Sequence, residues 1–285
     1  MNATLAVTLQ TEKITIANFY NMKMTNKLLV AGLLALAVGM TACSSSEDNP
    51  TATTADDTTA GTSVVTFSLS ANTSFSATSG RTVDEDYYST LSNYTVELEE
   101  YGEILYEWTG EDMPSSLELT NGAYTLLAYC GEDEAASTES MYVYGETVFN
   151  INSSDESVTV SCLPVCAKVT VNFDESMDTY FSDYSMTFST SALGSDTWTW
   201  EADETGPVYL KVDDDESVAA TINMTHIETG ATSTKDLTLT LSPAVSQTVN
   251  VSTQEYSGDI TGITITIDTE TTEETIEIDI PSEWK

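Results

Sequence analysis

The chain has 285 residues, of which 46 are acidic and 8 are basic, so its formal net charge at pH 7 is −38. A surface this negative repels phosphate groups, which argues against nucleic acid as a partner and against electrostatic adsorption to anionic lipids. Hydrophobic residues make up 40% of the chain, a share too high for a disordered protein. A chain of this length commonly forms one or two domains.

The first informative segment is an apolar run that ends near a cysteine. Lys23 and Lys27 precede the run, which covers residues 28–40, and a threonine and an alanine separate it from Cys43. The run is too short to span a bilayer and is typical of an export signal. The pattern resembles bacterial lipoprotein signals, in which the cysteine is acylated, for example with palmitate, and becomes the first mature residue. We therefore expect residues 1–42 to be an upstream segment and signal peptide, and Cys43 to be the lipidation site; the alternative is an ordinary signal followed by a chance cysteine.

Residues 43–62 are rich in Ser, Thr, Ala and Asp and contain no large apolar side chain. This composition predicts a flexible tether between the lipid and the fold. Its serine-rich start, followed by Glu47 and Asp48, resembles the acidic export tags of lipoproteins that reach the outer face of the outer membrane. We expect a protein anchored by lipid in the outer membrane and exposed at the cell surface.

From Ser63 onward, apolar and polar residues alternate repeatedly, and threonine is the usual polar partner. A period of two predicts half-buried strands, and threonine suits the solvated face of a sheet. The pattern predicts an all-β fold of two tandem antiparallel β-sandwich domains. One short helix is expected at residues 174–181, capped by Asp174. The clearest predicted strands are 64–69, 94–99, 158–162, 169–173, 237–241, 249–251, 263–268 and 275–280.

A domain boundary is expected at Pro164, because proline cannot continue a central strand and a fresh alternating strand follows at Lys168. The predicted N-terminal sandwich is residues 63–163, and the predicted C-terminal sandwich is residues 164–285. Each side is long enough for one sandwich.

Three cysteines follow Cys43, at positions 130, 162 and 166. An odd number leaves at least one free thiol, and no second pair of ligands accompanies Cys162 and Cys166 to form a metal site. We expect buried free thiols; a disulfide between Cys130 and Cys162 is the alternative.

Three stretches resemble the fimbrillin-like surface lipoproteins of bacteria: residues 117–129, 162–171 and 206–211. In the first stretch we expect Gly122 to adopt positive φ in a turn, with Tyr124 and Leu126 on one face of the following strand. The resemblance implies a surface-anchored protein with transthyretin-like domains. Some members of the family are pilus subunits or adhesins, so it also implies other fimbria-like subunits or host ligands as partners.

In members of this family that polymerise, a protease cuts after a basic residue and removes the first strand, and a strand from the next subunit fills the groove. Arg81 is the only basic residue between Lys27 and Lys168. We therefore interpret it as a candidate processing site after the predicted strand 64–69. The alternative is a solitary arginine in a polar surface loop.

No catalytic motif is recognisable. His226 is the only histidine, and the alternation places it on a strand, on the same face as Ile222 and Met224. There is no nucleophile elbow and no nucleotide-binding glycine loop. The acidic runs at 84–86 and 213–216 lack the spacing of a calcium loop and are expected to be solvated turns. We predict no enzyme activity, no metal site and no cofactor.

Two pairs of aromatic residues are the best candidates for a ligand platform: Trp198 with Trp200, and Tyr142 with Tyr144. Residues two apart on a strand project from one face, so each exposed pair would offer rings for stacking on a sugar. The alternative is core packing, which is the usual fate of large aromatic side chains. The sequence thus favours a non-enzymatic surface protein of adhesion or fimbria-like interaction. The runner-up is a carbohydrate-binding surface lipoprotein that captures glycans.

Overall fold

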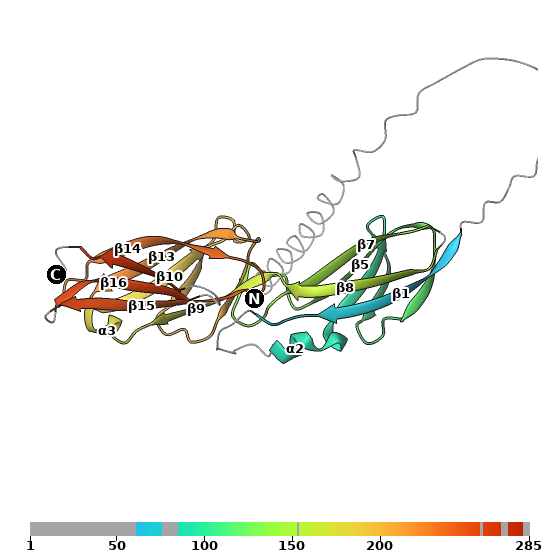
Figure 1. The fold of residues 1–285 in the computed structure, drawn as a ribbon. Coiled ribbons are helices and arrows are strands. Elements are labelled where there is room, and N and C mark those ends of the chain that lie inside the picture. The colour runs from blue at the N-terminus through green and yellow to red at the C-terminus, as the bar shows by residue number, and fades with distance from the viewer. Residues whose placement is uncertain (1–60, 76–84, 153, 257–258, 269–272, 282–285) are drawn as a thin grey trace, which may run out of the picture. The chain divides into compact units, whose positions relative to one another are not determined.

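The computed structural model describes residues 61–75, 85–152, 154–256, 259–268 and 273–281 (Figure 1). The predicted signal peptide, Cys43, almost all of the predicted tether and Arg81 lie outside the described residues. Within the described part of the chain, no helix is long and apolar enough to cross a membrane.

Regular structure is almost entirely β, so the predicted all-β class is confirmed. The helical elements are α2 (Glu85–Ser89), η1 (Leu91–Asn93) and α3 (Met177–Tyr180). The strands are β1 (Thr62–Ala71), β2 (Thr95–Glu100), β3 (Glu103–Thr109), β4 (Ser116–Thr120), β5 (Gly122–Cys130), β6 (Ala136–Ser137), β7 (Val143–Ile151), β8 (Glu156–Pro164), β9 (Cys166–Phe173), β10 (Phe181–Ser189), β11 (Trp198–Glu201), β12 (Val208–Lys211), β13 (Glu216–His226), β14 (Thr232–Leu241), β15 (Ser246–Tyr256), β16 (Asp259–Asp268) and β17 (Glu273–Asp279).

The strands form three sheets. A seven-stranded sheet has the order β3-β2-β5-β7-β8-β1-β4, a four-stranded sheet the order β11-β10-β13-β14, and a six-stranded sheet the order β17-β16-β15-β9-β12-β6. Most neighbours are antiparallel, but β1 runs parallel to β8 and β15 runs parallel to β9. In Figure 1, β1, β5, β7 and β8 lie together with α2, and β9, β10 and β13–β16 lie together with α3.

The alternation in the sequence matches the alternation in burial. In β8, Val158, Val160 and Cys162 are buried while the residues between them are exposed. Along β13, every second residue from Val218 to His226 is buried. Because successive side chains of a strand point to opposite faces, this pattern buries one face of each strand and leaves its polar face in solvent.

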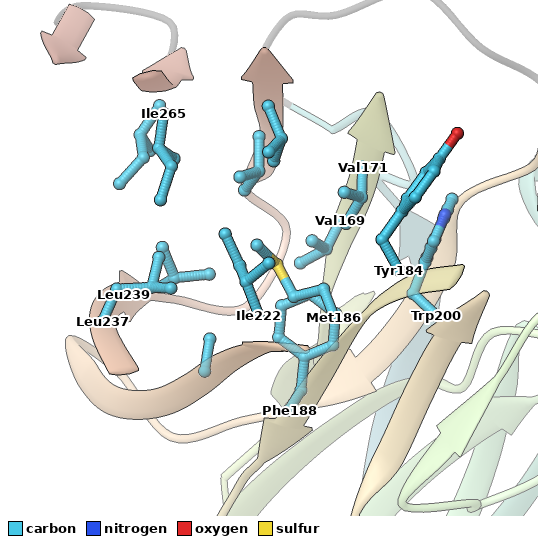
Figure 2. Close-up of a cluster of buried hydrophobic side chains, with 14 of the residues drawn as sticks. Val169, Val171, Tyr184, Met186, Phe188, Trp200, Ile222, Leu237, Leu239 and Ile265 are labelled. Carbon is cyan, nitrogen blue, oxygen red and sulfur yellow. The ribbon is translucent and has the colours of Figure 1, made fainter. Parts of the chain in front are cut away.

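Two hydrophobic clusters result. The first contains side chains of β1, β2, β5, β7 and β8, among them Phe67, whose ring lies 6.5 Å from that of Trp108 and 6.4 Å from that of Phe149. The second draws on the four-stranded and six-stranded sheets, and Figure 2 shows part of it. Pro164 is the last residue of β8, and Cys166 begins β9, so the chain passes from one sheet to the next at the predicted boundary residue.

Two local predictions need correction. Gly122 is not among the glycines with positive φ; it is already paired with Ile151 in β5. A Cβ atom there would lie 3.1 Å from Glu100 Oε1 and 3.2 Å from the Tyr124 ring, so crowding explains the glycine. Tyr124 and Leu126 share the buried face, as predicted.

The predicted helix at 174–181 is shorter than expected, and its cap is different. Helix α3 begins at Met177, and the residue before it, Ser176, makes no side-chain capping bond. Asp174 instead accepts a hydrogen bond from the Ser176 backbone N–H at 2.9 Å, and its carbonyl accepts one from the Met177 N–H. Asp174 therefore stabilises the turn before the helix rather than the helix itself.

Tyr94 connects the segment around α2 to the first hydrophobic cluster through a buried hydrogen bond. Its side chain is buried, and its hydroxyl donates a 2.7 Å hydrogen bond to the backbone carbonyl of Tyr88. Burial raises the pKa of Tyr94, so this hydroxyl stays protonated and available as a donor.

We expect Tyr94→Phe to lower the free energy of unfolding by about 1–2 kcal/mol, because the Tyr88 carbonyl loses its buried donor while packing is kept. Urea denaturation followed by circular dichroism measures this. Tyr101→Phe is the matched control, since Tyr101 is 84% exposed, and it should leave the midpoint unchanged. Equal midpoints for both variants would show that the Tyr94 hydroxyl adds no stability.

The three cysteines are buried free thiols, which agrees with the first of the two readings of the sequence. The Cys162 thiol lies 3.5 Å from the Ala128 carbonyl and donates to it. Burial raises the pKa of Cys130 to about 11 and the pKa of Cys162 and Cys166 to about 12.

These pKa values predict a loss of stability at high pH. An unfolded thiol has a pKa of 9.0, so each thiol's contribution is complete below pH 9 and is lost as the pH rises toward 12. We expect the free energy of unfolding to fall between pH 9 and pH 11, and to fall less in a variant with all three cysteines changed to alanine. Rapid reaction of the native protein with a thiol reagent at pH 8 would contradict the buried placement.

Candidate functional site

The predicted pair Tyr142 and Tyr144 comes together with a third tyrosine on the solvated face of the first sheet. Tyr144 lies in β7 directly opposite Tyr129 of β5, and Tyr142 precedes β7 by one residue. The rings of Tyr142 and Tyr144 stack with centroids 6.1 Å apart, and the rings of Tyr129 and Tyr142 lie 6.2 Å apart. All three side chains are half-buried. We call this group the tyrosine row.

Carboxylates accept hydrogen bonds from the hydroxyl groups at both ends of the tyrosine row. Tyr129 donates to Glu97 Oε1 at 3.0 Å, and Tyr144 donates to Glu146 Oε2 at 2.5 Å. Burial, followed by the bond to Glu97, raises the pKa of Tyr129, and burial followed by the bond to Glu146 raises the pKa of Tyr144. Tyr142 has a pKa raised to about 12 by burial and by the nearby charge of Asp133. The row is therefore neutral at physiological pH and is bordered by negative charge.

Gly145 allows the backbones of β7 and β8 to approach closely beside the tyrosine row. A Cβ atom at Gly145 would meet the Ser161 carbonyl oxygen at 2.4 Å and its carbon at 2.8 Å. The backbone of β8 therefore passes close to β7 between Tyr144 and Glu146, and only glycine fits. In the same pair of strands, Leu163 of β8 lies opposite Tyr144 of β7 and is 49% exposed.

The second predicted pair is not an exposed platform. Trp198 and Trp200 do share one face of β11, but they lie opposite Phe188 and Met186, which are both buried. Trp200 is 1% exposed and lies in the cluster drawn in Figure 2, and Trp198 packs against the same cluster. Core packing, the alternative reading, is thus correct for Trp200, because β11 pairs with β10 and the tryptophan face of β11 continues the buried face of the sheet.

His226 takes the predicted place at the end of β13, on the buried face with Ile222 and Met224. Its Nδ1 lies 3.2 Å from the Thr229 hydroxyl. This bond ties the ring to the turn that follows the strand.

The acidic run at 213–216 is a turn between β12 and β13, in which Asp215 has φ of 52°. Glu216 accepts backbone N–H bonds from Ser191 at 2.6 Å and from Asp213 at 2.8 Å. Partial burial alone would raise the pKa of Glu216, but these bonds lower it. Within the described ranges, no three His, Cys, Asp or Glu side chains are arranged to hold a metal ion.

Sequence reasoning missed Tyr129 and Glu97 as members of the site. Both belong to stretches that were recognised as strands, and both alternate onto the solvated face. The missing information was the pairing of β5 with β2 and β7, which alone brings these residues beside Tyr142 and Tyr144.

Several solved structures resemble this chain at low sequence identity. One is named as candidate polysaccharide-binding proteins from Bacteroides thetaiotaomicron (TM-score 0.41, 11% identity, covering 78% of this chain and 100% of that one). Another is named as a fimbrial assembly protein from Parabacteroides distasonis (TM-score 0.37, 12% identity, 76% and 98%). A third is named as a candidate cell adhesion protein from Bacteroides eggerthii (TM-score 0.40, 12% identity, 79% and 98%).

These are proteins of the kind that the resemblance of the sequence predicts. No curated protein matches the chain. The family model described as "Domain of unknown function (DUF4493)" matches residues 61–282, and the chain belongs to this family.

Proposed function

We propose that this protein is a lipid-anchored adhesin or fimbria-like component of the bacterial cell surface, without catalytic activity. In this proposal Cys43 carries the acyl chains in the outer membrane, and residues 43–62 are a tether. Two tandem β-sandwich domains follow, residues 63–163 and residues 164–285. The partners are other fimbria-like subunits or host ligands.

The observation that carries the proposal is the position of β1 within its sheet. β1 lies between β8 and β4, parallel to the first and antiparallel to the second. Hydroxyl pairs join it to β8, with Ser68 2.6 Å from Thr159 and Ser70 3.0 Å from Ser161. In the sequence, one segment links β1 to the strands that follow it, and this segment contains Arg81.

Removal of β1 would leave a slot that needs another strand. Val65 and Phe67 are buried, and burial of such side chains contributes about 1.5–3 kcal/mol each. The facing backbone groups of β8 and β4 would also lose their partners. A strand from another subunit with the same alternation would restore both, which is the physical basis of strand exchange between subunits.

Carbohydrate capture is the second candidate. Trp200 lies in the core and cannot contact a sugar, so the tyrosine row is the structural feature that still favours a carbohydrate site. Aromatic side chains that keep a polar end in solvent are suited to ligand contact.

Limited trypsin digestion tests the strand-exchange form of the proposal. We expect cleavage after Arg81, loss of the fragment that contains β1, and a ladder of oligomers in size-exclusion chromatography. Arg81→Gln should remain intact and monomeric under the same conditions. If the β1 fragment stays bound after cleavage and no oligomers form, strand exchange is wrong.

Anchoring is tested separately by mass spectrometry of the mature N-terminus from membrane fractions. We expect an acylated Cys43, and we expect Cys43→Ser to move the protein out of the outer-membrane fraction. An unmodified chain that starts elsewhere, in the native protein, would contradict the anchor.

A further inference from the structure

The solvated face of β3, β2, β5 and β7 concentrates negative charge around the tyrosine row. Glu97 of β2 lies directly opposite Glu107 of β3 on one side and Leu127 of β5 on the other, and Leu127 in turn lies opposite Glu146 of β7. Three carboxylates therefore occupy one line across four strands. We call this line the carboxylate line; it runs beside the tyrosine row.

Charges of the same sign at directly opposite positions destabilise a sheet, because their Cβ atoms are only about 4.5–5.5 Å apart. Glu97 adds a second cost, since its side chain is only 9% exposed. The neutral Tyr129 hydroxyl donates a hydrogen bond to it, which relieves desolvation without cancelling the charge. The sheet thus maintains a charge arrangement that its own stability does not favour.

The sequence supplies no compensating cation from this part of the chain. Between Thr82 and Ala167 there is no Lys, Arg or His. Lys211 reaches the border of the site and pairs with Asp133, whose charge acts on Tyr142. Besides burial, the charges of Glu97 and Glu107 in the carboxylate line both raise the pKa of Tyr129.

The tyrosine rings favour the same kind of ligand as the carboxylates. The face of an aromatic ring attracts a cation within about 6 Å of its centroid, and the attraction strengthens when the cation is desolvated. Because Tyr129 and Tyr144 donate directly to Glu97 and Glu146, a lysine or arginine side chain that lay over this face would meet rings and carboxylates together. Exposed apolar side chains border the group, with Leu163 49% exposed and Val148 64% exposed.

We propose that this face, the tyrosine row with the carboxylate line, docks a basic polypeptide segment of a partner protein. Charge complementarity decides against the other occupants. A second copy that presented this same acidic face would be repelled from it, as would an anionic glycan. A neutral glycan would leave the carboxylates uncompensated. The proposal names the partner chemistry of the adhesion role proposed above, and it rests on that role.

Isothermal titration calorimetry of the full mature chain tests the proposal. The probe is a short synthetic peptide of alternating lysine and valine; the comparison ligands are the same peptide with glutamate for lysine, and dextran as a neutral glycan. We expect binding of the lysine peptide alone, weakening as salt rises.

Matched variants separate this face from general attraction to an acidic protein. Glu107→Gln with Glu146→Gln removes two exposed charges from the carboxylate line and should weaken binding about tenfold. Glu201→Gln with Glu228→Gln removes two exposed charges elsewhere and should change it less than about twofold. Tyr142→Leu, with an unchanged melting temperature, should also weaken binding.

Equal effects of the two charge pairs would overturn the proposal in favour of nonspecific attraction. Dextran binding that is lost in Tyr142→Leu, without peptide binding, would overturn it in favour of a carbohydrate site. The tests at Cys43 and Arg81 do not depend on peptide binding. A negative result with the peptide would therefore reject the partner chemistry without rejecting the surface role.

Discussion

The seven-stranded sheet depends on the parallel pairing of β1 with β8. Without it, the pair of strands β1 and β4 would be separated from the other five strands, and Val65 and Phe67 would leave the first cluster. The pairing joins residues about ninety positions apart in the sequence, for example Phe67 with Val158. Such a contact carries a high cost in chain entropy and has no short connection to support it. Side-chain burial, ladder hydrogen bonds and the hydroxyl pairs with β8 hold the strand in place. The proposed strand exchange requires that these non-covalent interactions be given up when β1 is removed.

A second constraint is electrostatic. In the described part of the chain, most acidic side chains are exposed on strands or in turns, where water screens them. Glu97 is different, because the pairing of β2 with β3 and β5 draws it into a crowded line with Glu107 and Leu127. Tyr129 donates one hydrogen bond to its carboxylate and leaves the charge in place. The sheet retains this unfavourable charge arrangement beside half-buried aromatic rings, and the proposed ligand accounts for both features.

The two aromatic pairs show how far local periodicity carries a prediction. Both pairs share a face, as residues two apart on a strand must. Which face is buried depends on the neighbouring strands: β11 packs its face against Phe188 and Met186, whereas β7 turns Tyr144 toward solvent beside Tyr129. Gly122 illustrates the same limit, since its requirement comes from the crowding of Glu100 and Tyr124 rather than from a turn.

The sequence by itself determined the all-β class, the positions of many strands, the residues that share a face in β5 and β13, and the negative charge, because these follow from alternation and composition. Only the tertiary structure decided that β1 lies between β8 and β4, that Trp200 belongs to the core, and that Glu97 and Tyr129 join Tyr142 and Tyr144. The physical reason is that strand pairing is non-local: a period of two states which residues share a face, but the partner strands decide what that face meets.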